Sequence, residues 1–466
     1  MSFLDSLVKF SEDIWYLPLV LIVLLGIYST LRLRGVQIAG LKEMCHSTFG
    51  NDRGTGKPSP FQVFCMSMGN RIGVGNITGP VLAITVGGPG AIFWMWVFAF
   101  IGTATSMLET TVGQIYKTKH ADGRLHGGPA YNIAKGLGLR RASMIVAFIM
   151  VLMYLLGFVS MEVSSMSSAI NGAFGFETWA IAIVLTIITA YVIFGGVTRV
   201  AKLSTAIVPA MGIVWLIVCA ICIALSDGGV INAFVMIFQY ALNVPSAVGG
   251  GIGAMLLIGM RRGVLSNEAG VGTITNISSM APVSHPVRQG YSQALGVILD
   301  TVVSTLTALV ILSFGSFSEI WAEYSVQGES IPLLQAVMDA SIGGLAPYLV
   351  AIFLFIFAFT SLIADYVIGE NNMAFITDSK HARLAVCVFL LIVVFLSSMF
   401  ASDALFAIVD ILLAVCGVIN CLVMFKLGSR AVEAFRDYRR QRESGTSVPE
   451  FKKDCLSDQT GVTEWD

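Results

Sequence analysis

Residues 69–79 read GNRIGVGNITG and lie inside an apolar stretch that is long enough to cross a bilayer. Six glycines and asparagines among these eleven residues predict that the membrane helix breaks near its middle. Lipid offers no hydrogen bonds to freed backbone groups, so a break at this depth must line a cavity. Its carbonyls and helix ends can then bind ions and polar substrate groups, and the segment therefore predicts a transport site.

Three residues of this segment suit a bound ligand. Gly73 and Gly75 would let a ligand approach the backbone closely. Asn76 could bind a sodium ion through its oxygen, bind the substrate through its amide, or cap the half-helix that begins there. The N–H groups at the start of that half-helix would suit a substrate carboxylate. We expect a second glycine-rich break to face the site from the opposite side, at Gly249, Gly250, Gly251 and Gly253.

Ionisable side chains at membrane depth are costly and are therefore functional candidates. Here they are Arg71, Glu109, Glu162, Asp300, Asp365 and Asp410. Arg71 could hold a substrate carboxylate or form a buried ion pair with Glu109 or Asp300. Asp300 could instead bind a substrate ammonium or a cation. Glu109 lies about 27 Å along its span at 1.5 Å per residue, so we expect it in a salt bridge near the cytoplasmic surface. Glu162 and Asp410 receive no role.

The composition is that of a polytopic membrane protein. Of 466 residues, 56% are hydrophobic and 12% are charged, whereas a soluble chain carries about 25% charged residues. The net charge of -1 argues against a nucleic-acid partner. The five histidines fall in loops and flanks, and no Ser/His, His/Glu or metal-ligand arrangement is visible, so we do not expect an enzyme.

Eleven apolar stretches predict an all-α protein of eleven transmembrane helices. They run over 14–31, 61–86, 91–116, 143–170, 178–195, 203–225, 244–262, 291–314, 347–369, 384–400 and 404–425. Lys and Arg are present in alternate connections, which places the N-terminus outside the cell membrane and the C-terminus in the cytoplasm. The charged stretch from about 431 is expected to extend the last helix and then to be disordered.

Two of the predicted spans, the first and sixth of the ten that follow the N-terminal one, are interrupted by glycine. The segment GVGNIT at 73–78 also recurs as GVGTIT at 270–275. By the loop charges the two interrupted spans run in opposite directions, which is typical of two inverted five-span repeats. SNEAG at 266–270 should end the sixth span at the cytoplasmic side, where Glu268 could act as a gate. The predicted units are a peripheral span and loop at 1–60, repeats at 61–225 and 226–426, and a cytoplasmic tail at 427–466.

Several motifs, in order between residues 60 and 430, resemble those of the alanine/glycine:cation symporters, also called sodium:alanine symporters. They are GVGNITG (73–79), GGPGAIFWMW (87–96), HGGPAYNIAKGLG (126–138), RRGVLSNEAGVG (261–272), HPVRQGYSQALGVILDT (285–301), FAFTS (357–361) and GE (369–370). The resemblance implies a leucine-transporter-type fold with a 5+5 inverted repeat and one extra N-terminal span. GNRIGVGN is also similar to GNAxGLGN of the neurotransmitter:sodium symporters.

The resemblance implies a sodium site in this fold. Its ligands would be the backbone carbonyls of Gly69, Ile72 and Phe357 and the hydroxyls of Thr360 and Ser361. Neutral oxygen ligands of this kind suit a hard cation. Thr360 and Ser361 could instead only bond back to their own helix.

Asp365 departs from the family pattern, in which a Trp usually follows the Thr-Ser pair at this position. An Asp would make the substrate site larger and more acidic than a Trp would, which suits a polar, amide or cationic substrate. Asp365 could instead face a neighbouring helix and pair with a basic group.

Together these features predict a sodium-coupled symporter that moves an amino acid into the cell by alternating access. The amino acid would be alanine, glycine or another small or polar one, and the co-transported ion would be sodium. The lipid bilayer is the other expected partner. A proton-coupled transporter on the same scaffold is the nearest alternative, since buried carboxylates could carry a proton. An ion channel is a second alternative, but the spans show isolated polar residues and no continuous polar stripe.

Overall fold

The structure, a computed structural model, describes residues 3–50, 58–121, 123–242, 251–315, 330–400 and 403–465. These residues are mostly α-helical. A short antiparallel pair, β1 (Thr118–Lys119) and β2 (Leu125–His126), is the only sheet among the described ranges. The expected all-α class therefore agrees with the structure.

The helices of the first half include the first break. They are α1 (Phe3–Asp13), α2 (Tyr16–Arg32), α3 (Val36–Ala39), α4 (Leu41–Phe49), α5 (Pro60–Arg71), α6 (Gly75–Gly87), α7 (Ala91–Ile115), α8 (Pro129–Tyr131), α9 (Arg140–Leu152), α10 (Val159–Phe174), α11 (Thr178–Ile193), α12 (Gly196–Leu225) and α13 (Val230–Leu242). Two π-helical stretches, η1 (Asn132–Gly136) and η2 (Met153–Phe158), follow α8 and α9.

The helices of the second half include the second break. They are α14 (Gly251–Asn267), α15 (Thr275–Ser278), α16 (Pro286–Leu312), α18 (Ser330–Ile342), α19 (Ala346–Ile376), α20 (Lys380–Met399) and α21 (Asp403–Glu443), with the 3-10 turn η3 (Lys453–Cys455) after them.

Eight helical stretches of the described residues are long and apolar enough to cross a membrane. They are Ser6–Arg32, Ala91–Ile115, Arg140–Phe174, Gly196–Leu225, Pro286–Leu312, Ala346–Ile376, Lys380–Met399 and Leu405–Glu443. Three predicted spans are missing from this set because their helices are broken or short. Two consist of half-helices, α5–α6 and α14–α15, and α11 has only 16 residues.

Local sequence explains where the first broken helix begins and ends. Ser59 and Gln62 form a capping box at the start of α5, with Ser59 Oγ accepting from Gln62 N at 3.3 Å, and Pro60 takes the first helical position. The helix ends at Arg71, because Ile72 has a non-helical backbone with φ −83° and ψ 76°. α6 starts three residues later, at Gly75, so the predicted break at this position is present.

The second break lies at residues 268–274, not at the predicted 249–253. α14 is continuous from Gly251 to Asn267. Gly253 lies within this helix, and residues 243–250, including Gly249 and Gly250, fall outside the described part of the chain. The helix stops after Asn267 because Glu268, Gly270 and Gly272 all have positive φ angles. The predicted span 244–262 therefore ends too early, and Arg261 belongs to the helix, not to a basic loop.

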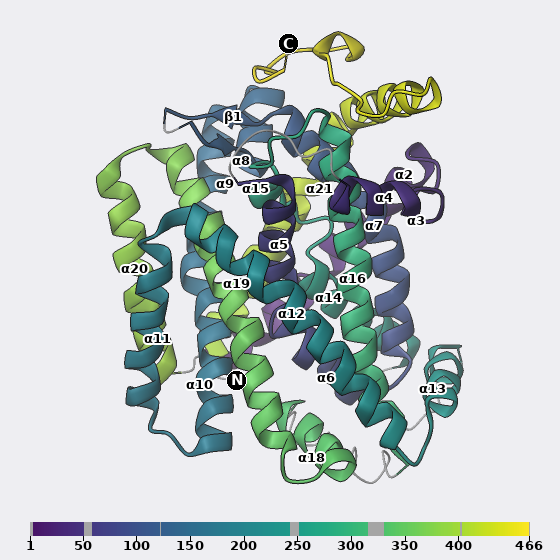
Figure 1. Ribbon diagram of the computed structural model, residues 1–466, viewed down its shortest axis with the longest axis vertical. Helices are drawn as coiled ribbons and strands as arrows, with labels where there is room; N and C mark the ends of the chain where they lie inside the picture. Colours follow the sequence, from purple (N-terminus) through teal and green to yellow (C-terminus); the bar gives the residue numbers. More distant parts are fainter. Residues whose placement is uncertain are drawn as a thin grey trace.

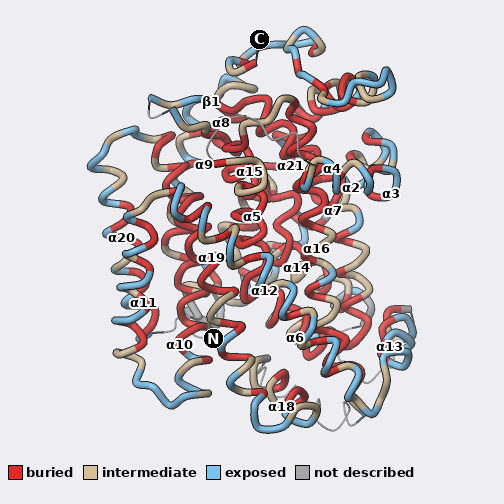
Figure 2. Tube along the Cα trace, in the orientation of Figure 1, coloured by how far each residue is buried: buried red, intermediate tan, exposed pale blue. Residues whose placement is uncertain are grey.

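The half-helices lie inside the bundle. α5 packs against α12, α16 and α19, and α14 packs against α6 and α7. Figure 2 shows buried residues concentrated along these central helices, whereas α11 and α20 turn exposed residues outward. In Figure 1, α13 and α18 lie at one end of the bundle and β1, α8 and the C-terminal segment lie at the other.

Residues 444–465 are folded against the bundle, which corrects the expectation of disorder. The Trp465 indole Nε1 donates to the Gln114 carbonyl oxygen at 3.0 Å, and its ring centroid lies 4.0 Å from Lys117 Nζ. The segment is ordered because it buries four large apolar side chains, those of Phe451, Leu456, Val462 and Trp465.

Candidate transport site

The two helix breaks have related sequences and meet inside the bundle. GNRIGVGNIT at 69–78 and SNEAGVGTIT at 266–275 are identical at six of ten positions. In this alignment Arg71 and Glu268 occupy equivalent positions with opposite charges. Arg71 Nε donates to the Asn267 carbonyl oxygen at 3.0 Å, so the ends of α5 and α14 are in direct contact.

Arg71 is fully surrounded by hydrogen-bond acceptors from three further groups. Its Nη1 donates to Gln293 Oε1 at 2.9 Å and to the Gln293 carbonyl at 3.1 Å, and its Nη2 donates to Ser106 Oγ at 2.9 Å. The side chain is buried. Among the described residues no carboxylate lies within ion-pair distance of Arg71, so the predicted pair with Glu109 or Asp300 is wrong.

The oxygen atoms of the predicted sodium site lie close together. Ser361 Oγ on α19 donates to the Gly69 carbonyl oxygen at 2.9 Å, across to α5. Thr360 Oγ1 bonds back to the Phe357 carbonyl at 2.9 Å. Ile72 follows directly on α5. In a continuous helix its carbonyl would accept from Asn76 N, but Asn76 N bonds to the Gly73 carbonyl instead. Carbonyls and hydroxyls from two helices thus converge at the first break.

Asn76 and Asp300 form a second polar group beside the break. Asn76 Nδ2 donates to Asp300 Oδ1 at 2.5 Å and to Ser304 Oγ at 3.1 Å. Asn76 Oδ1 accepts from Gly73 N at 3.2 Å, so this oxygen caps the break. Ser266 Oγ donates to Asp300 Oδ2 at 2.8 Å. Sequence reasoning missed Ser266 and Ser304, since small polar residues in apolar spans carry no distinctive signal.

A small cavity adjoins this group between α7, α14 and α16. Its volume is about 10 Å³, and Ser266, Asp300 and Ser304 are among its lining residues. This is room for about one water-sized particle. Gly75 lies nearby in open space, because a Cβ built on it would meet nothing closer than the Leu265 carbonyl at 3.9 Å.

Asp365 faces the first break and not a basic partner. Its Oδ1 accepts from Asn70 Nδ2 at 3.1 Å, and its Oδ2 has no hydrogen-bond partner. The residue is buried and lies one helical turn beyond Ser361 on α19. An ion pair with a basic group, one of the two expected possibilities, is not found among the described residues.

Glu268 lies inside the second break, which corrects its expected position at the end of the span. Its φ of 53° is unusual for a residue with a side chain. Its Oε2 accepts from Tyr154 Oη at 2.9 Å and from Thr273 Oγ1 at 2.5 Å. Tyr154 belongs to the π-helical η2, a feature that often marks functional sites. Sequence reasoning missed Tyr154, because nothing in the sequence signals a π-helical turn.

Four other residues that the sequence singles out have different surroundings. Gly253 is exposed and lines a groove between α2 and α14. Gly251 is the first residue of α14. Glu109 is buried against α21, where its Oε2 accepts from Asn420 Nδ2 at 3.0 Å, so it forms no surface salt bridge. Asp410 pairs with Arg261 instead of facing the site.

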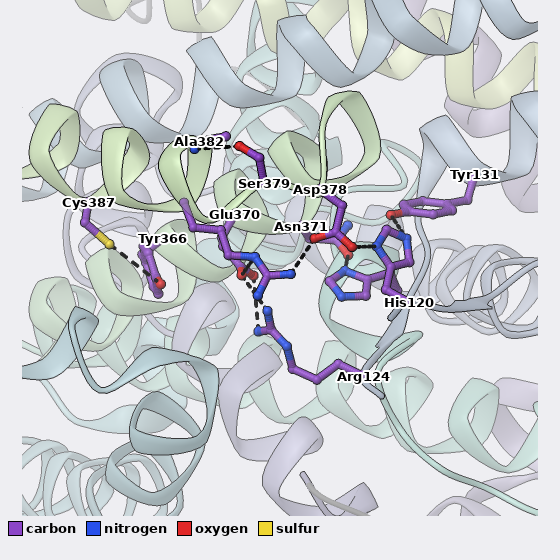
Figure 3. A network of polar contacts seen from close by, with 12 residues as sticks. His120, Arg124, Tyr131, Tyr366, Glu370, Asn371, Asp378, Ser379, Ala382 and Cys387 are labelled. Atoms are coloured by element: carbon purple, nitrogen blue, oxygen red, sulfur yellow. Dashed lines mark hydrogen bonds and ion pairs between the residues drawn. The ribbon is translucent and has the colours of Figure 1, made fainter. Parts of the chain in front are cut away.

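A polar network joins the β1–β2 segment to the ends of α19 and α20 (Figure 3). Arg124 Nη2 lies 2.7 Å from Glu370 Oε1, and Arg383 Nη2 lies 2.5 Å from Asp378 Oδ1. His120 Nδ1 lies 3.5 Å from Asp378 Oδ2. The network closes the end of the bundle at which the C-terminal segment lies.

The sequence profile of the sodium:alanine symporter family matches residues 1–453. The chain belongs to the sodium:alanine symporter family. The predicted family is thereby confirmed, and the chain is a transporter and not an enzyme.

Relatives in the family align over almost the whole chain. The amino-acid carrier protein AlsT of Bacillus subtilis is 34% identical and covers 100% of this chain and 98% of its own length. The probable sodium/glutamine symporter GlnT of the same organism is 36% identical, and the alignment covers 99% of this chain and 96% of GlnT. The putative sodium/proton-dependent alanine carrier protein YrbD, also from Bacillus subtilis, is 35% identical, and the alignment covers 95% of this chain and 93% of YrbD.

A solved structure shares the fold. A Na+-coupled sialic acid symporter in a substrate-bound outward-open state superposes with a TM-score of 0.51 and 12% sequence identity. The superposition covers 92% of this chain and 86% of that chain. At this identity the likeness concerns the fold alone.

Proposed function

We propose that this family member couples the entry of sodium to the entry of a small or polar amino acid by alternating access. The observation that carries the proposal is the contact between Ser361 Oγ and the Gly69 carbonyl at 2.9 Å, at the point where α5 ends. It joins a hydroxyl of α19 to a carbonyl that has lost its helical donor. Such oxygens are suitable ligands for a hard cation.

The architecture in this proposal is a 5+5 inverted repeat plus the peripheral α2, with eleven spans in all. The repeats would be residues 61–225 and 226–426, after an N-terminal unit at 1–60 and before a tail at 427–466. Two breaks of related sequence, at 72–74 and 268–274, support this arrangement. Each would be the broken first helix of its repeat.

The sodium ligands in this proposal are the carbonyls of Gly69, Ile72 and Phe357 and the hydroxyls of Thr360 and Ser361. These atoms belong to one small region of α5 and α19, which supports a single site. Asn76, whose oxygen accepts from Gly73 N and has a second lone pair, would act as a substrate or ion contact.

The amino acid would bind between the two breaks. Its carboxylate would meet the N–H groups at the start of α6, around Gly73 and Gly75, where the positive end of the helix dipole lies. Asp300 and Asp365 are the acidic side chains that would meet its ammonium or a polar side chain. The opposite wall would be residues 268–274, in place of the glycines at 249–253.

The membrane orientation in this proposal has the N-terminus outside and the C-terminus in the cytoplasm. Residues 32–42, 117–124 and 380–383, which each hold two or three Lys or Arg residues, lie toward the same end as the C-terminal segment (Figure 1), which supports it.

Purified protein in liposomes tests the function. Labelled amino acids would be offered with a sodium gradient and a proton gradient imposed separately. Uptake that follows the sodium gradient supports the proposal. Uptake that follows only the proton gradient favours the alternative, which the name of the relative YrbD also suggests.

A further inference from the structure

Glu162 is a buried carboxylate beside the first helix break and has no role in the site as described so far. It lies on α10, two turns beyond Tyr154, and the residue is only 6% exposed. Its Oε1 lies 3.0 Å from the position that a Cβ on Gly73 would take. Ser361 Oγ lies still closer to that position. The carboxylate and the hydroxyl therefore adjoin in the space left by the missing side chain of Gly73.

The oxygen atoms at this point have too few hydrogen-bond donors. Ser361 has one hydroxyl hydrogen, which it donates to the Gly69 carbonyl. The Gly73 N–H would bond to the Gly69 carbonyl in a continuous helix, but it bonds to the Arg71 carbonyl at 3.0 Å and to Asn76 Oδ1 at 3.2 Å. The Gly69 carbonyl and the Glu162 carboxylate therefore compete for the one Ser361 hydroxyl hydrogen, and the carboxylate has the Val74 N–H as its other donor.

In its ionised form Glu162 has no compensating charge nearby in the described part of the chain. Its Oε2 has no hydrogen-bond partner, and among the described residues no Lys, Arg or His nitrogen lies within 4.0 Å of the carboxylate. The groups that act on it are the Val74 N–H and the Ser361 hydroxyl, both uncharged. An unpaired carboxylate at membrane depth costs several kcal/mol, and a bound cation would remove most of that cost.

We propose that Glu162 is a direct ligand of the co-transported sodium ion. The ion would lie between the Glu162 carboxylate, the Ser361 hydroxyl and the Gly69 carbonyl. This inference rests on the proposed sodium-coupled function and adds one charged ligand to a set of neutral oxygens. It also adds a third helix, so that sodium would connect α10 to α5 and α19.

The test measures sodium binding by the purified full-length protein, as the sodium concentration that gives half of the maximal sodium-dependent thermal stabilisation. Glu162→Gln should raise this concentration at least tenfold, which corresponds to about 1.4 kcal/mol. Glu162→Asp keeps the charge on a shorter side chain and should raise it less. Glu109→Gln, at a buried acid that accepts from Asn420 on α21, is the matched control and should leave it unchanged.

The order of the two Glu162 variants distinguishes a ligand from a packing group. If the carboxylate only accepts hydrogen bonds, Gln, which has the same length, should behave like the native residue and Asp should be worse. That order would overturn the inference. Chemical labelling of the native protein gives a test that does not depend on the folding of any variant. Sodium, but not potassium, should protect Glu162 from dicyclohexylcarbodiimide, as read by mass spectrometry, and equal modification in both salts would also overturn it.

The double variant Thr360→Val with Ser361→Ala separates this inference from the proposed function. It should also raise the half-maximal sodium concentration at least tenfold, because two hydroxyl ligands are lost. If only the double variant has this effect, the sodium site stands and Glu162 is not part of it. If the double variant binds sodium normally, the proposed site itself is wrong.

Discussion

Arg71 and Asn267, the last residues of α5 and α14, are joined by a hydrogen bond from Arg71 Nε to the Asn267 carbonyl oxygen at 3.0 Å. Both broken helices end at this bond, so the negative ends of two helix dipoles meet one guanidinium. Gln293 and Ser106 accept the other bonds of the guanidinium and connect it to α16 and α7. Arg71 thus holds four helices in a fixed relation around the site.

Arg71→Gln should destabilise the protein, because the shorter amide cannot reach all of these acceptors and leaves buried carbonyls unpaired. Each lost hydrogen bond from a charged group is worth about 1.5–3 kcal/mol. The apparent melting temperature in detergent should therefore fall clearly. Arg199→Gln, at an exposed arginine in the first turn of α12, is the control and should change it little. Equal melting temperatures for the two variants would show that Arg71 does not hold the breaks together.

Gly73 and Gly75 should respond differently to substitution. A Cβ on Gly73 would collide with Ser361 Oγ and press on Glu162 Oε1, so Gly73→Ala should impair sodium binding. Gly75→Ala has room and should bind sodium normally. Gly75→Leu should fold but lose uptake, since its side chain would fill the space proposed for the substrate. Sodium titration and uptake on the same preparations give both readouts, and near-normal uptake by Gly75→Leu would exclude this region as the substrate site.

Asp365 should control substrate selection if its unpartnered Oδ2 faces the substrate. Asp365→Trp should shrink the site and shift uptake towards alanine and glycine. Asp365→Asn keeps the size and the bond from Asn70 but removes the charge, so selective loss of a cationic amino acid would identify the charge as the cause. The measurement is competition by a panel of amino acids. An unchanged ranking in both variants would place Asp365 outside the pocket.

The contact between residues 444–465 and the bundle should depend on pH through Lys117. Burial lowers the pKa of Lys117 from 10.5 to about 7, and Glu464 opposes this shift. The Trp465 ring covers the amine, whose hydrogen bond goes to Gln114. A released segment would leave Lys117 with its ordinary pKa, so docking releases a proton between about pH 7 and 10.5. Docking should therefore strengthen as the pH rises through this window, and the dependence should vanish below pH 7.

Limited trypsin cleavage after Lys452 and Lys453 measures this docking. Cleavage should be slower at pH 9 than at pH 7, relative to an unfolded peptide of the same sequence that corrects for the activity of trypsin. Lys117→Gln should remove the difference, and Trp465→Ala should speed cleavage at both values. If the cleavage rate of Lys117→Gln still differs between pH 7 and pH 9, a group other than Lys117 causes the pH dependence.

The first break could be predicted from the sequence because its signal is local. GNRIGVGNITG concentrates helix-breaking residues in the middle of an apolar span, and the structure breaks within that segment. The prediction of a second break at 249–253 is wrong. It follows the dense glycines there, which look like a stronger helix-breaking signal than residues 268–274. Glycine only permits a break, and α14 continues through Gly253. The better indication is the internal repeat, since SNEAGVGTIT is identical to the first break at six of ten positions.

The partners of the buried charges could not be predicted from the sequence. Arg71 bonds to a carbonyl of α14, to the amide of Gln293 on α16 and to the hydroxyl of Ser106 on α7, and each of these acceptors is an ordinary residue of its own span. Glu162 was visible as a charge at membrane depth, but its proximity to Ser361 depends on how α10 and α19 pack. The order of residues 444–465 likewise depends on surfaces that only the folded bundle provides.

Simultaneous measurement of two fluxes would show whether the entry of sodium and the entry of the amino acid are coupled. Proteoliposomes would receive radioactive sodium and a labelled amino acid on the outside, with no proton gradient. Each solute should enter only when the other is present, and the two should enter in a fixed ratio. Sodium entry without the amino acid would indicate a channel, and amino-acid entry that ignores sodium would contradict sodium coupling.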